Sequence, residues 1–494
     1  MRGFVQEDLG AKLPHLIVLG GGLAGLSAAW AALRSKRACR LTLLEKEDRP
    51  GGLARSVEVG GVTTDLGPHR IHTTIPEMRQ WFREFLGPEM LEIERISHMR
   101  FRGRFLRYPP AALEMLRALG PLDAAHFALG YASARTRVLA SRLGKDSFAS
   151  VMEGAFGRPL CEALVFPYVR KMWKTSPDRV SADSARVRVT MGGLARVARR
   201  AFAPGREKTG EESTLQTFCY VRGGIERLAR KLADEIRARG GRIACQADLW
   251  RLVLDDDRRV RRIEYRDGEG FIRSMEGDFV FASIPLPDLV EAIRRDSKTS
   301  RFMDQAAAAA AGLRFLHIML VAIVLRRPSL SRDHWLYFPE AEPPVNRAYE
   351  PKNFDESLGP KDRTLLCVES SALPGSAEWE RSDAEIASEA VAHAAETGLF
   401  RPSEVIETSV LRLERAYPLY LLDYSERLAG IWASLRTIGN LIPLGRQGLF
   451  QHNNMDHAIC TGLRAARCWS EEENPAARWY DQEMESFRRF RIVD

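Results

Sequence analysis

The stretch "HLIVLGGGLAGLSAAWAAL", residues 15–33, joins a short run of buried-strand type to an Ala- and Leu-rich helical pattern. Gly20, Gly22 and Gly25 lie at the junction, in the order G-x-G-x-x-G. At such a turn the first glycine permits the tight bend, the second lets a pyrophosphate approach the backbone, and the third lets helix and strand pack closely. The N-terminus of the helix also attracts phosphate through its N–H groups and its dipole. The pattern predicts a dinucleotide-binding βαβ unit.

The segments that follow indicate which dinucleotide is bound. A second strand pattern, "CRLTLLEKE", contains Glu45 twenty residues after Gly25, where a carboxylate would accept hydrogen bonds from the adenosine ribose and would disfavour a 2′-phosphate. Directly after it, "RPGGLARS" supplies Gly51-Gly52 and Arg55, so a second loop can close over a long dinucleotide with an arginine near its phosphates. This pair of motifs resembles that of the glutathione-reductase-like FAD superfamily. FAD is therefore the predicted cofactor.

The composition limits the classes of function. A chain of 494 residues favours two intimately joined domains, and 45% hydrophobic with 28% charged residues is typical of a soluble globular protein. The net charge of +8 favours an anionic ligand, but the basic residues are scattered, so nucleic acid is not expected.

Seven dispersed cysteines indicate reduced thiols and a cytoplasmic location. The longest apolar run, residues 315–325, is too short to span a bilayer and predicts a buried strand; peripheral membrane contact stays open.

A second unusual stretch is "DLGPHRIHT", residues 65–73, with two histidines around an arginine. A zinc site is disfavoured because His69 and His72 lack a convincing third ligand nearby. Gly67-Pro68 follows a strand and would bring the backbone close to the flavin ring. We therefore expect His69 to border the isoalloxazine, Arg70 to place positive charge near its N1 side or near the substrate, and His72 to be a structural core residue.

The remaining chain alternates helical and strand patterns. Residues 76–150 are expected to be mostly helical with a hairpin at 99–110, and an amphipathic helix with a strand, turn and strand is expected over 223–255. A further buried strand, near residue 280, should lead into a Pro-punctuated loop. Strands should recur from 313 to 418, where "HWLYFPEAEPPVNRAYEPKNF" suits either a substrate-facing loop or a surface loop. A last strand should end at Gly445-Arg446, before a helix that begins near Asn454.

Three further segments define a broader resemblance. "GPHRIHT", "FPYVRKMWKTSPDRVSADSARVRV" and "GRQGLFQHNNMDH" are similar to motifs of the FAD-dependent amine oxidase and protoporphyrinogen oxidase superfamily, and within it to the UDP-galactopyranose mutase-like branch. The chain departs from those mutases in two places. His452 and Asn453 stand where they use tyrosines to hold the nucleotide diphosphate, and Arg70 stands where they usually carry an apolar residue.

The resemblance implies a fold and a division of the chain. The expected class is α/β (α+β), a glutathione-reductase-like FAD-binding fold with an inserted substrate domain of mixed helices and antiparallel sheet. Residues 14–75, 217–300 and 420–470 would form a discontinuous FAD-binding domain. Residues 76–216 and 301–419 would form the substrate domain, and 471–494 a C-terminal helical tail.

The motifs and the resemblance together give a set of expected site residues. Those expected to be catalytic are His69 and Arg70, and no metal is expected. The expected FAD contacts are Gly20, Gly22, Leu23, Ala24, Gly25, Glu45, Lys46, Gly51, Gly52, Leu53, Ala54, Arg55, Gly67, Pro68, His69, Leu249, Gly445, Arg446, Asn454, Met455 and Asp456. The expected substrate contacts are Tyr168, Trp173, Arg186, Arg188, His452 and Asn453.

Three functional hypotheses follow. The leading one is an FAD-dependent oxidoreductase that exchanges a hydride between flavin N5 and an unidentified small molecule, either anionic or hydrophobic. The second is a mutase-like enzyme that acts on a nucleotide-sugar without net redox change, with Arg186 and Arg188 neutralising a departing phosphate. The third, from another class, is a flavin-binding protein without catalytic turnover.

Overall fold

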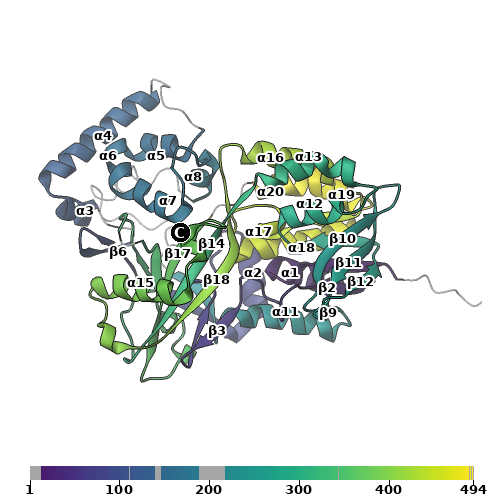
Figure 1. Ribbon diagram of the computed structural model, residues 1–494, viewed down its shortest axis with the longest axis horizontal. Helices are drawn as coiled ribbons and strands as arrows, with labels where there is room; N and C mark the ends of the chain where they lie inside the picture. Colours follow the sequence, from purple (N-terminus) through teal and green to yellow (C-terminus); the bar gives the residue numbers. More distant parts are fainter. Residues whose placement is uncertain are drawn as a thin grey trace, which may run out of the picture.

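The structure is a computed structural model that describes residues 13–108, 110, 112–139, 146–188, 217–342, 344–488, 490 and 492. Its first unit is a five-stranded, wholly parallel sheet of order β19-β13-β1-β2-β9, seen at the right of Figure 1. Its strands are β1 (His15–Leu19), β2 (Arg40–Leu44), β9 (Arg242–Ala244), β13 (Phe279–Ala282) and β19 (Leu441–Pro443). Parallel strands buried on both faces carry near-continuous apolar runs, as "LIVL" does in β1.

Two layers cover this sheet. One apolar core joins it to helices α1 (Leu23–Arg34), α2 (Pro76–Leu86), α11 (Glu226–Ala238) and α18 (Met455–Glu471). A second core joins it to an antiparallel sheet and three more helices: β10 (Asp248–Leu254), β11 (Val260–Arg266), β12 (Ile272–Glu276), α12 (Leu286–Arg294), α13 (Ser300–Ala311) and α16 (Tyr424–Leu435). The expected amphipathic helix is confirmed, because α11 buries Leu228, Leu232 and Ile236 on one side.

The second unit is built on a seven-stranded sheet of order β18-β14-β17-β16-β15-β6-β7. Its strands are β6 (Ser97–Phe101), β7 (Arg104–Arg107), β14 (Arg314–Leu325), β15 (Trp335–Tyr337), β16 (Arg347–Tyr349), β17 (Thr364–Ala372) and β18 (Val405–Leu419). The expected buried strand at 315–325 and the expected hairpin at 99–110 are therefore both confirmed. Helix α15 (Asp383–Glu396) packs on one face, and the hairpin β3 (Ser56–Val59)–β4 (Val62–Asp65) packs on the other.

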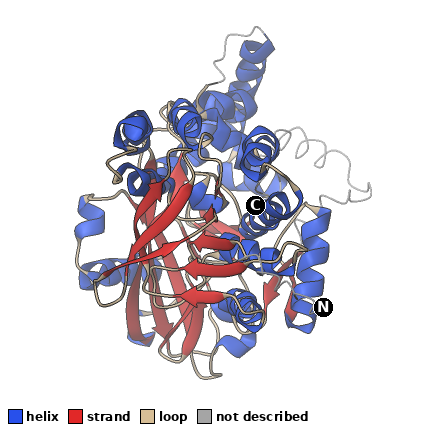
Figure 2. Cartoon of the chain, turned by 90° about the vertical axis from the view of Figure 1, so that its right-hand side faces the viewer, coloured by secondary structure: helices blue, strands red, loops and turns tan. Residues whose placement is uncertain are grey.

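A helical lobe stands above the large sheet, as the view in Figure 2 shows. It contains α3 (Ala112–Leu119), α4 (Pro121–Leu139), α5 (Phe148–Phe156), α6 (Arg158–Leu160), α7 (Phe166–Trp173) and α8 (Ala182–Arg188). Two expectations need correction. Residues 90–94 form β5 (Met90–Glu94) rather than helix, because they pair with β8 (Thr217–Val221), 127 residues later in the chain. The loop after β13 is also short, since Pro285 is the N-cap of α12 and Pro287 is its second residue.

The fold class predicted from the sequence is thus confirmed. Mixed helices and sheets are arranged as a parallel dinucleotide-binding sheet, with a second unit inserted between its strands. The C-terminal residues form three short helical segments after α18, namely α19 (Pro475–Arg478), a π-helical turn (Trp479–Glu483) and α20 (Met484–Phe487). The exact domain boundaries proposed from the sequence stay a prediction.

Candidate functional site

Each glycine of the first motif has its own structural reason. Gly20 has a φ of +95°, a conformation that favours glycine, and makes the tight turn after β1. A Cβ on Gly25 would lie 2.0 Å from the carbonyl oxygen of Gly20, so the helix can approach the strand only without a side chain there. Gly22 is different, because its φ of −70° and ψ of 173° suit any residue.

The space beside Gly22 points to a ligand. A Cβ placed on Gly22 would meet only the Cα of Gly52, at 4.0 Å, among protein atoms within that distance. The two glycine loops face each other here, since Gly51 donates its N–H to the carbonyl of Gly21 at 2.8 Å and Gly22 bridges to Gly51. Helix α1 begins at this point with no side-chain cap on its N–H groups. The residues present therefore fit the pyrophosphate of a dinucleotide.

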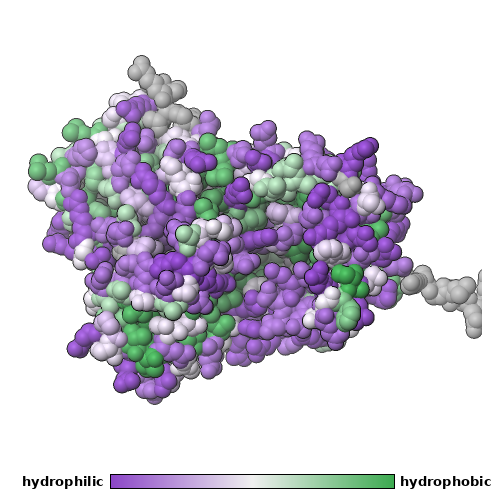
Figure 3. Space-filling model, in the orientation of Figure 1, coloured by the Kyte–Doolittle hydropathy of each residue, from purple (hydrophilic) through white to green (hydrophobic). Residues whose placement is uncertain are grey.

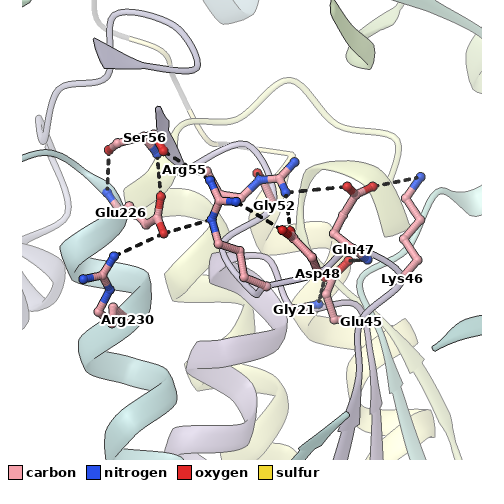
Figure 4. Close-up of polar contacts among 11 residues, drawn as sticks. Gly21, Glu45, Lys46, Glu47, Asp48, Gly52, Arg55, Ser56, Glu226 and Arg230 are labelled. Atoms are coloured by element: carbon pink, nitrogen blue, oxygen red, sulfur yellow. Dashed lines mark hydrogen bonds and ion pairs between the residues drawn. The ribbon is translucent and has the colours of Figure 1, made fainter. Parts of the chain in front are cut away.

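Glu45 is fixed at the end of β2, beside the same loop (Figure 4). Its carboxylate accepts the N–H of Gly21 at 2.6 Å and the N–H of Glu47 at 3.0 Å, and the side chain is buried. The chain leading into β10 lies next to it, because Ala247 donates its N–H to the carbonyl of Glu45 at 2.8 Å. Leu249, two residues further on, is thereby brought to the Glu45 side of the fold, where an adenosine group is expected.

The basic residues of the second motif are oriented by acidic neighbours (Figure 4). Arg55 donates from Nε to the carbonyl of Gly52 at 3.0 Å and lies 3.6 Å from the carboxylate of Glu47 and 3.8 Å from that of Asp48. Lys46 is exposed and lies 3.7 Å from Glu47. Arg55 is therefore at the glycine loop as expected, but its charge is already balanced, so a phosphate would have to share it.

The last motif packs directly on the first. Gly445 has a φ of +76°, and a Cβ on it would lie 2.6 Å from the Cβ of Ala24 in α1. Arg446 donates to the carbonyl of Asn453 at 2.6 Å, which folds the connection between β19 and α18 into a tight loop. Helix α18 has Asn454 as its N-cap, as the sequence predicted, and Met455 and the buried Asp456 form its first turn. Because β1 and β19 belong to one parallel sheet, both helix N-termini lie at the same edge.

The stretch "DLGPHRIHT" is fixed by the carboxylate of Asp65. This carboxylate accepts hydrogen bonds from the hydroxyls of Ser56 and Tyr220, each at 2.6 Å, and from the N–H of Ile225 at 3.1 Å. Burial raises the pKa of Asp65 to about 6, although these hydrogen bonds act in the opposite direction. The turn that follows uses Gly67 with a φ of +117°. The carboxylate thus links the turn to the start of α11.

We expect Asp65→Asn to change how stability depends on pH. A carboxyl with a pKa of about 6 when folded and 3.8 when unfolded stabilises the fold below pH 3.8 and loses that contribution as pH rises through 6. At about 1.4 kcal/mol per unit, the loss is about 3 kcal/mol. Urea denaturation at pH 4.5, 5.5 and 6.5 should therefore show the variant gaining stability relative to wild type as pH rises. A difference that stays constant across this range would contradict the prediction.

A cavity of about 120 Å³ lies where these segments meet the second unit. Cofactor-motif residues Leu53, Asn454 and Met455 line one part of it. Its other lining residues include His69, Arg70, Trp335, Tyr337, Arg347, Glu369, Tyr417, Arg446, His452, Asn453 and Ile492. Of the expected catalytic and substrate residues, His69, Arg70, His452 and Asn453 are thus brought together.

Four of these side chains carry buried polar atoms with no hydrogen-bond partner among the described residues. They are His69 through Nδ1, Asn453 through both amide atoms, Arg347 through Nε and Glu369 through Oε1. Buried polar groups are nearly always paired, so a group of unpaired ones around a cavity indicates a polar ligand. Burial, with the nearby charges of Arg446 and Arg347, lowers the pKa of His69 to about 3, so its ring is neutral at ordinary pH.

Arg347 and Glu369 form a buried ion pair in the cavity wall. They face each other across strands β16 and β17, with Nη2 and Oε2 2.8 Å apart, and Glu369 is 2% exposed. Nearby, the guanidinium of Arg446 lies 4.9 Å from the ring centre of Tyr417, and that of Arg70 lies 5.3 Å from the ring centre of Trp335. The cavity therefore combines three arginines, one carboxylate and an aromatic wall.

Three residues of the motif in α7 have different structural environments. Trp173 is buried in an apolar cluster, edge-on to Phe148, and does not reach the cavity lining. Its predicted contact with substrate finds no support in this position, because a large apolar side chain is stabilised by core packing. Lys171 is buried and donates to the carbonyls of Phe338 and Glu340, which ties α7 to the loop after β15. Tyr168 is partly buried and is not among the cavity-lining residues; burial raises its pKa, although the nearby charge of Arg347 acts in the opposite direction.

Of the two arginines of α8, only Arg186 has a described side chain, and it is not among the residues that line the cavity. Arg186 is exposed and pairs with Asp183 at 2.8 Å, so its position does not support a substrate contact. Arg188 is the last residue of α8, and its side chain lies outside the described part of the structure.

Sequence reasoning missed much of the cavity wall. Trp335, Tyr337 and Arg347 come from the aromatic and Pro-rich segment 334–354, which the sequence left open between a substrate-facing and a surface loop. The unusual gathering of aromatic and charged residues there was the available signal. Glu369 and Tyr417 had no such signal, since each lies inside an ordinary strand pattern.

Two further properties of the described ranges concern membranes and metals. None of the helices there has both the length and the apolar character needed to cross a bilayer. Within the same ranges, no three His, Cys, Asp or Glu side chains gather in a way that could hold a metal ion.

Comparison with known proteins identifies the family. Residues 23–468 match the family of flavin-containing amine oxidoreductases. The chain belongs to this family. FAD is accordingly the cofactor of this chain, in agreement with the glycine loops, although the individual contacts stay predictions.

Curated relatives match the chain over short segments. A phytoene dehydrogenase of Streptomyces griseus is 33% identical over 156 residues, which is 30% of this chain and 29% of that protein. An L-amino acid oxidase of Crotalus durissus cumanensis is 32% identical over 107 residues, 20% of this chain and 21% of that protein. The matched regions thus span less than a third of either relative.

Solved structures match nearly the whole fold at low identity. Reduced UDP-galactopyranose mutase superposes with a TM-score of 0.78 at 20% identity, over 96% of this chain and 99% of that one. A protein described as a putative protoporphyrinogen oxidase from Exiguobacterium gives 0.69 at 18% identity, over 94% of this chain and 100% of that one. Identities this low establish the shared fold and leave the substrate of this chain undefined.

Proposed function

We propose that the protein is an FAD-dependent oxidoreductase that exchanges a hydride between an organic substrate and flavin N5. The observation that carries this proposal is the cavity at the junction of the two units. Leu53 and Asn454 from cofactor motifs and Tyr337 from the inserted unit line it together. Buried, unpartnered polar atoms of His69 and Asn453 border the same space. A substrate held there would lie between the cofactor motifs and a polar wall.

The residues of this chain would bind and orient the substrate. Bound FAD supplies the hydride acceptor or donor, so the protein needs no nucleophile of its own. The ring of His69 is neutral because its pKa is about 3, so its Nδ1 can form a hydrogen bond with the substrate or the flavin without adding charge to the cavity. Arg446 is held by the carbonyls of Asn453 and Ala416 and keeps the late loop closed against the cavity. The apolar and aromatic lining limits the access of water.

The charges favour a substrate with an anionic group. Among the described residues, Arg70, Arg347 and Arg446 line the cavity together with one carboxylate, that of Glu369. A cationic amine would meet an excess of positive charge here, whereas a carboxylate or phosphate would be attracted. The aromatic rings of Trp335 and Tyr337 offer a complementary surface for an apolar portion.

The mutase-like alternative is less well supported. It relied on arginines of α8 to neutralise a departing phosphate, and Arg186 is exposed, paired with Asp183 and away from the cavity lining. His452 and Asn453 also stand where the mutases use tyrosines. The high structural similarity to the reduced mutase concerns the fold.

Anaerobic spectroscopy tests the proposal. The purified FAD-loaded protein is mixed with a panel of organic acids, amino acids, amines, polyenes and UDP-galactopyranose. We expect one class, with an anionic group, to bleach the oxidised flavin absorption, which should return with oxygen or an artificial electron acceptor. Conversion of UDP-galactopyranose to its furanose form by the dithionite-reduced protein, with no acceptor consumed, would overturn the proposal in favour of the mutase.

His69→Ala should perturb the flavin site directly. Because His69 has a buried, unpartnered Nδ1 at the cavity, we expect a shifted flavin spectrum and a turnover slower by about 10- to 100-fold, in the range of lost hydrogen bonds in active sites. His72→Ala is the matched control and should lower the melting temperature while leaving the spectrum unchanged. A His69→Ala protein with wild-type spectrum and rate would show that the side chain does not border the flavin.

A further inference from the structure

Helix α4 presents an exposed apolar stripe. Leu122 and Leu129 are 86% and 72% exposed, the two highest values among the large hydrophobic residues that are exposed in the described structure. Ala125 and Ala132 are also exposed and continue the same face at helical spacing. No Asp, Glu, Lys or Arg lies between residues 124 and 134. Three turns of helix thus carry an uncharged outer face.

The opposite face of α4 is firmly packed. A Cβ on Gly130 would lie 2.5 Å from the ring of Pro159 in α6, and one on Gly157 would lie 2.7 Å from the backbone of Gly130. Ala134 is buried on this inner side. The orientation of the helix is therefore fixed by close contacts, and the stripe faces outward as a consequence of the fold. In Figures 1 and 3, α4 lies at the upper left and hydrophobic residues show at that outer edge.

Arginines lie at both ends of the stripe. At its N-terminal end, the tip of the hairpin β6–β7 contacts the start of α4, since Arg102 pairs with Asp123 at 2.6 Å and donates to the carbonyl of Leu119 at 3.2 Å. Arg104 in the same hairpin is exposed, and Arg135 and Arg137 are exposed at the C-terminal end of α4. Residues 97–139 contain seven arginines and two carboxylates, so this part of the lobe is strongly basic.

We propose that this face, defined by Leu122, Leu129 and the flanking arginines, docks the protein on an anionic lipid surface. An apolar stripe edged by basic residues matches the two components of such a surface, its acyl boundary and its negative headgroups. A second copy of the chain is a poorer partner, because a twofold contact would place like-charged arginines against one another. The hairpin also pairs with β15, so the docking face is connected to the strand that carries Tyr337 of the cavity.

Vesicle co-sedimentation of the full-length FAD-loaded protein tests the proposal. We expect binding to vesicles of phosphatidylcholine mixed with phosphatidylglycerol, and at least about tenfold weaker binding to phosphatidylcholine alone. Leu122→Ser/Leu129→Ser should reduce binding to the mixed vesicles by about tenfold or more, as should Arg135→Ser/Arg137→Ser. Both variants keep the inner face of α4, so flavin absorption and melting temperature should stay at wild-type values.

A matched control removes an apolar pair elsewhere. Phe271 and Ile272 are 60% and 48% exposed at the hairpin of β11 and β12, and Phe271→Ser/Ile272→Ser should leave vesicle binding unchanged. Equal loss in this control, or no preference for the anionic vesicles, would overturn the proposal. So would self-association of the wild type in light scattering that is abolished by Leu122→Ser/Leu129→Ser in the absence of vesicle binding.

Discussion

Gly22→Ala should abolish tight FAD binding while leaving the apoprotein folded. The added methyl group enters the space between the two glycine loops, where its nearest protein atom is the Cα of Gly52 at 4.0 Å. The φ and ψ of Gly22 are ordinary for alanine, so the stability of the apoprotein should change by less than about 1 kcal/mol. A pyrophosphate in that space would be displaced, and we expect an affinity loss of about 100-fold or more, equivalent to about 2.7 kcal/mol.

Titration of the apoprotein with FAD, followed by flavin fluorescence, measures this effect. Gly25→Ala is the matched control, because its Cβ would lie 2.0 Å from the carbonyl oxygen of Gly20 and should destabilise the apoprotein itself. The two variants thus separate a glycine required by the ligand from one required by packing. A Gly22→Ala protein that binds FAD as tightly as wild type would show that the phosphates lie elsewhere.

Glu369→Gln should cause the largest loss of stability among the single changes considered. The change leaves the guanidinium of Arg347 partly buried without its carboxylate, 2.8 Å away in the wild type. Breaking a buried ion pair in this way typically costs about 3–5 kcal/mol. We also expect the cavity to orient its substrate less strictly, because the guanidinium of Arg347 loses the carboxylate that holds it in place.

A double-mutant cycle isolates the pair. Arg347→Met alone should also destabilise the protein, whereas Arg347→Met/Glu369→Gln should lie much closer to wild type, because no uncompensated charge stays in the wall. Asp481→Asn breaks the exposed pair with Arg436 and should change stability by less than about 1 kcal/mol. Urea denaturation at constant salt measures the free energy of unfolding of the wild type and of these four variants. Additive effects of the two single changes would contradict a coupled buried pair.

The cofactor half of the site could be predicted because its signals are local. Gly20, Gly22 and Gly25 lie within six consecutive residues, where a strand, a loop and a helix follow one another. The sequence motif therefore shows directly where the backbone must turn tightly and pack closely. Glu45 is reached by counting to the end of the next strand. These features depend on short-range geometry, which the sequence expresses directly.

The substrate half depends on which strands become neighbours. Arg347 and Glu369 meet because β16 pairs with β17 in one particular register, and a shift of one strand by one residue would place the two side chains on opposite faces of the sheet. Nothing near either residue specifies that register. Trp173 illustrates the opposite difficulty: a motif resemblance suggested a ligand contact, but the packing around Phe148 places the indole in a core. Long-range pairing and side-chain packing are the parts that a single sequence leaves undetermined.

The parallel sheet also sets the order in which the protein can mature. Its central strand β1 pairs with β13, and β13 pairs with β19, so residues 16–19 are joined through residues 279–282 to residues 441–443. Contacts between such distant segments form slowly, since a long intervening chain must first be ordered. We therefore expect the N-terminal glycine loop to reach its final structure only after the segment around Gly445 has been synthesised and has packed against Ala24. We accordingly expect FAD to bind late in folding, and fragments that end before β19 should not retain it.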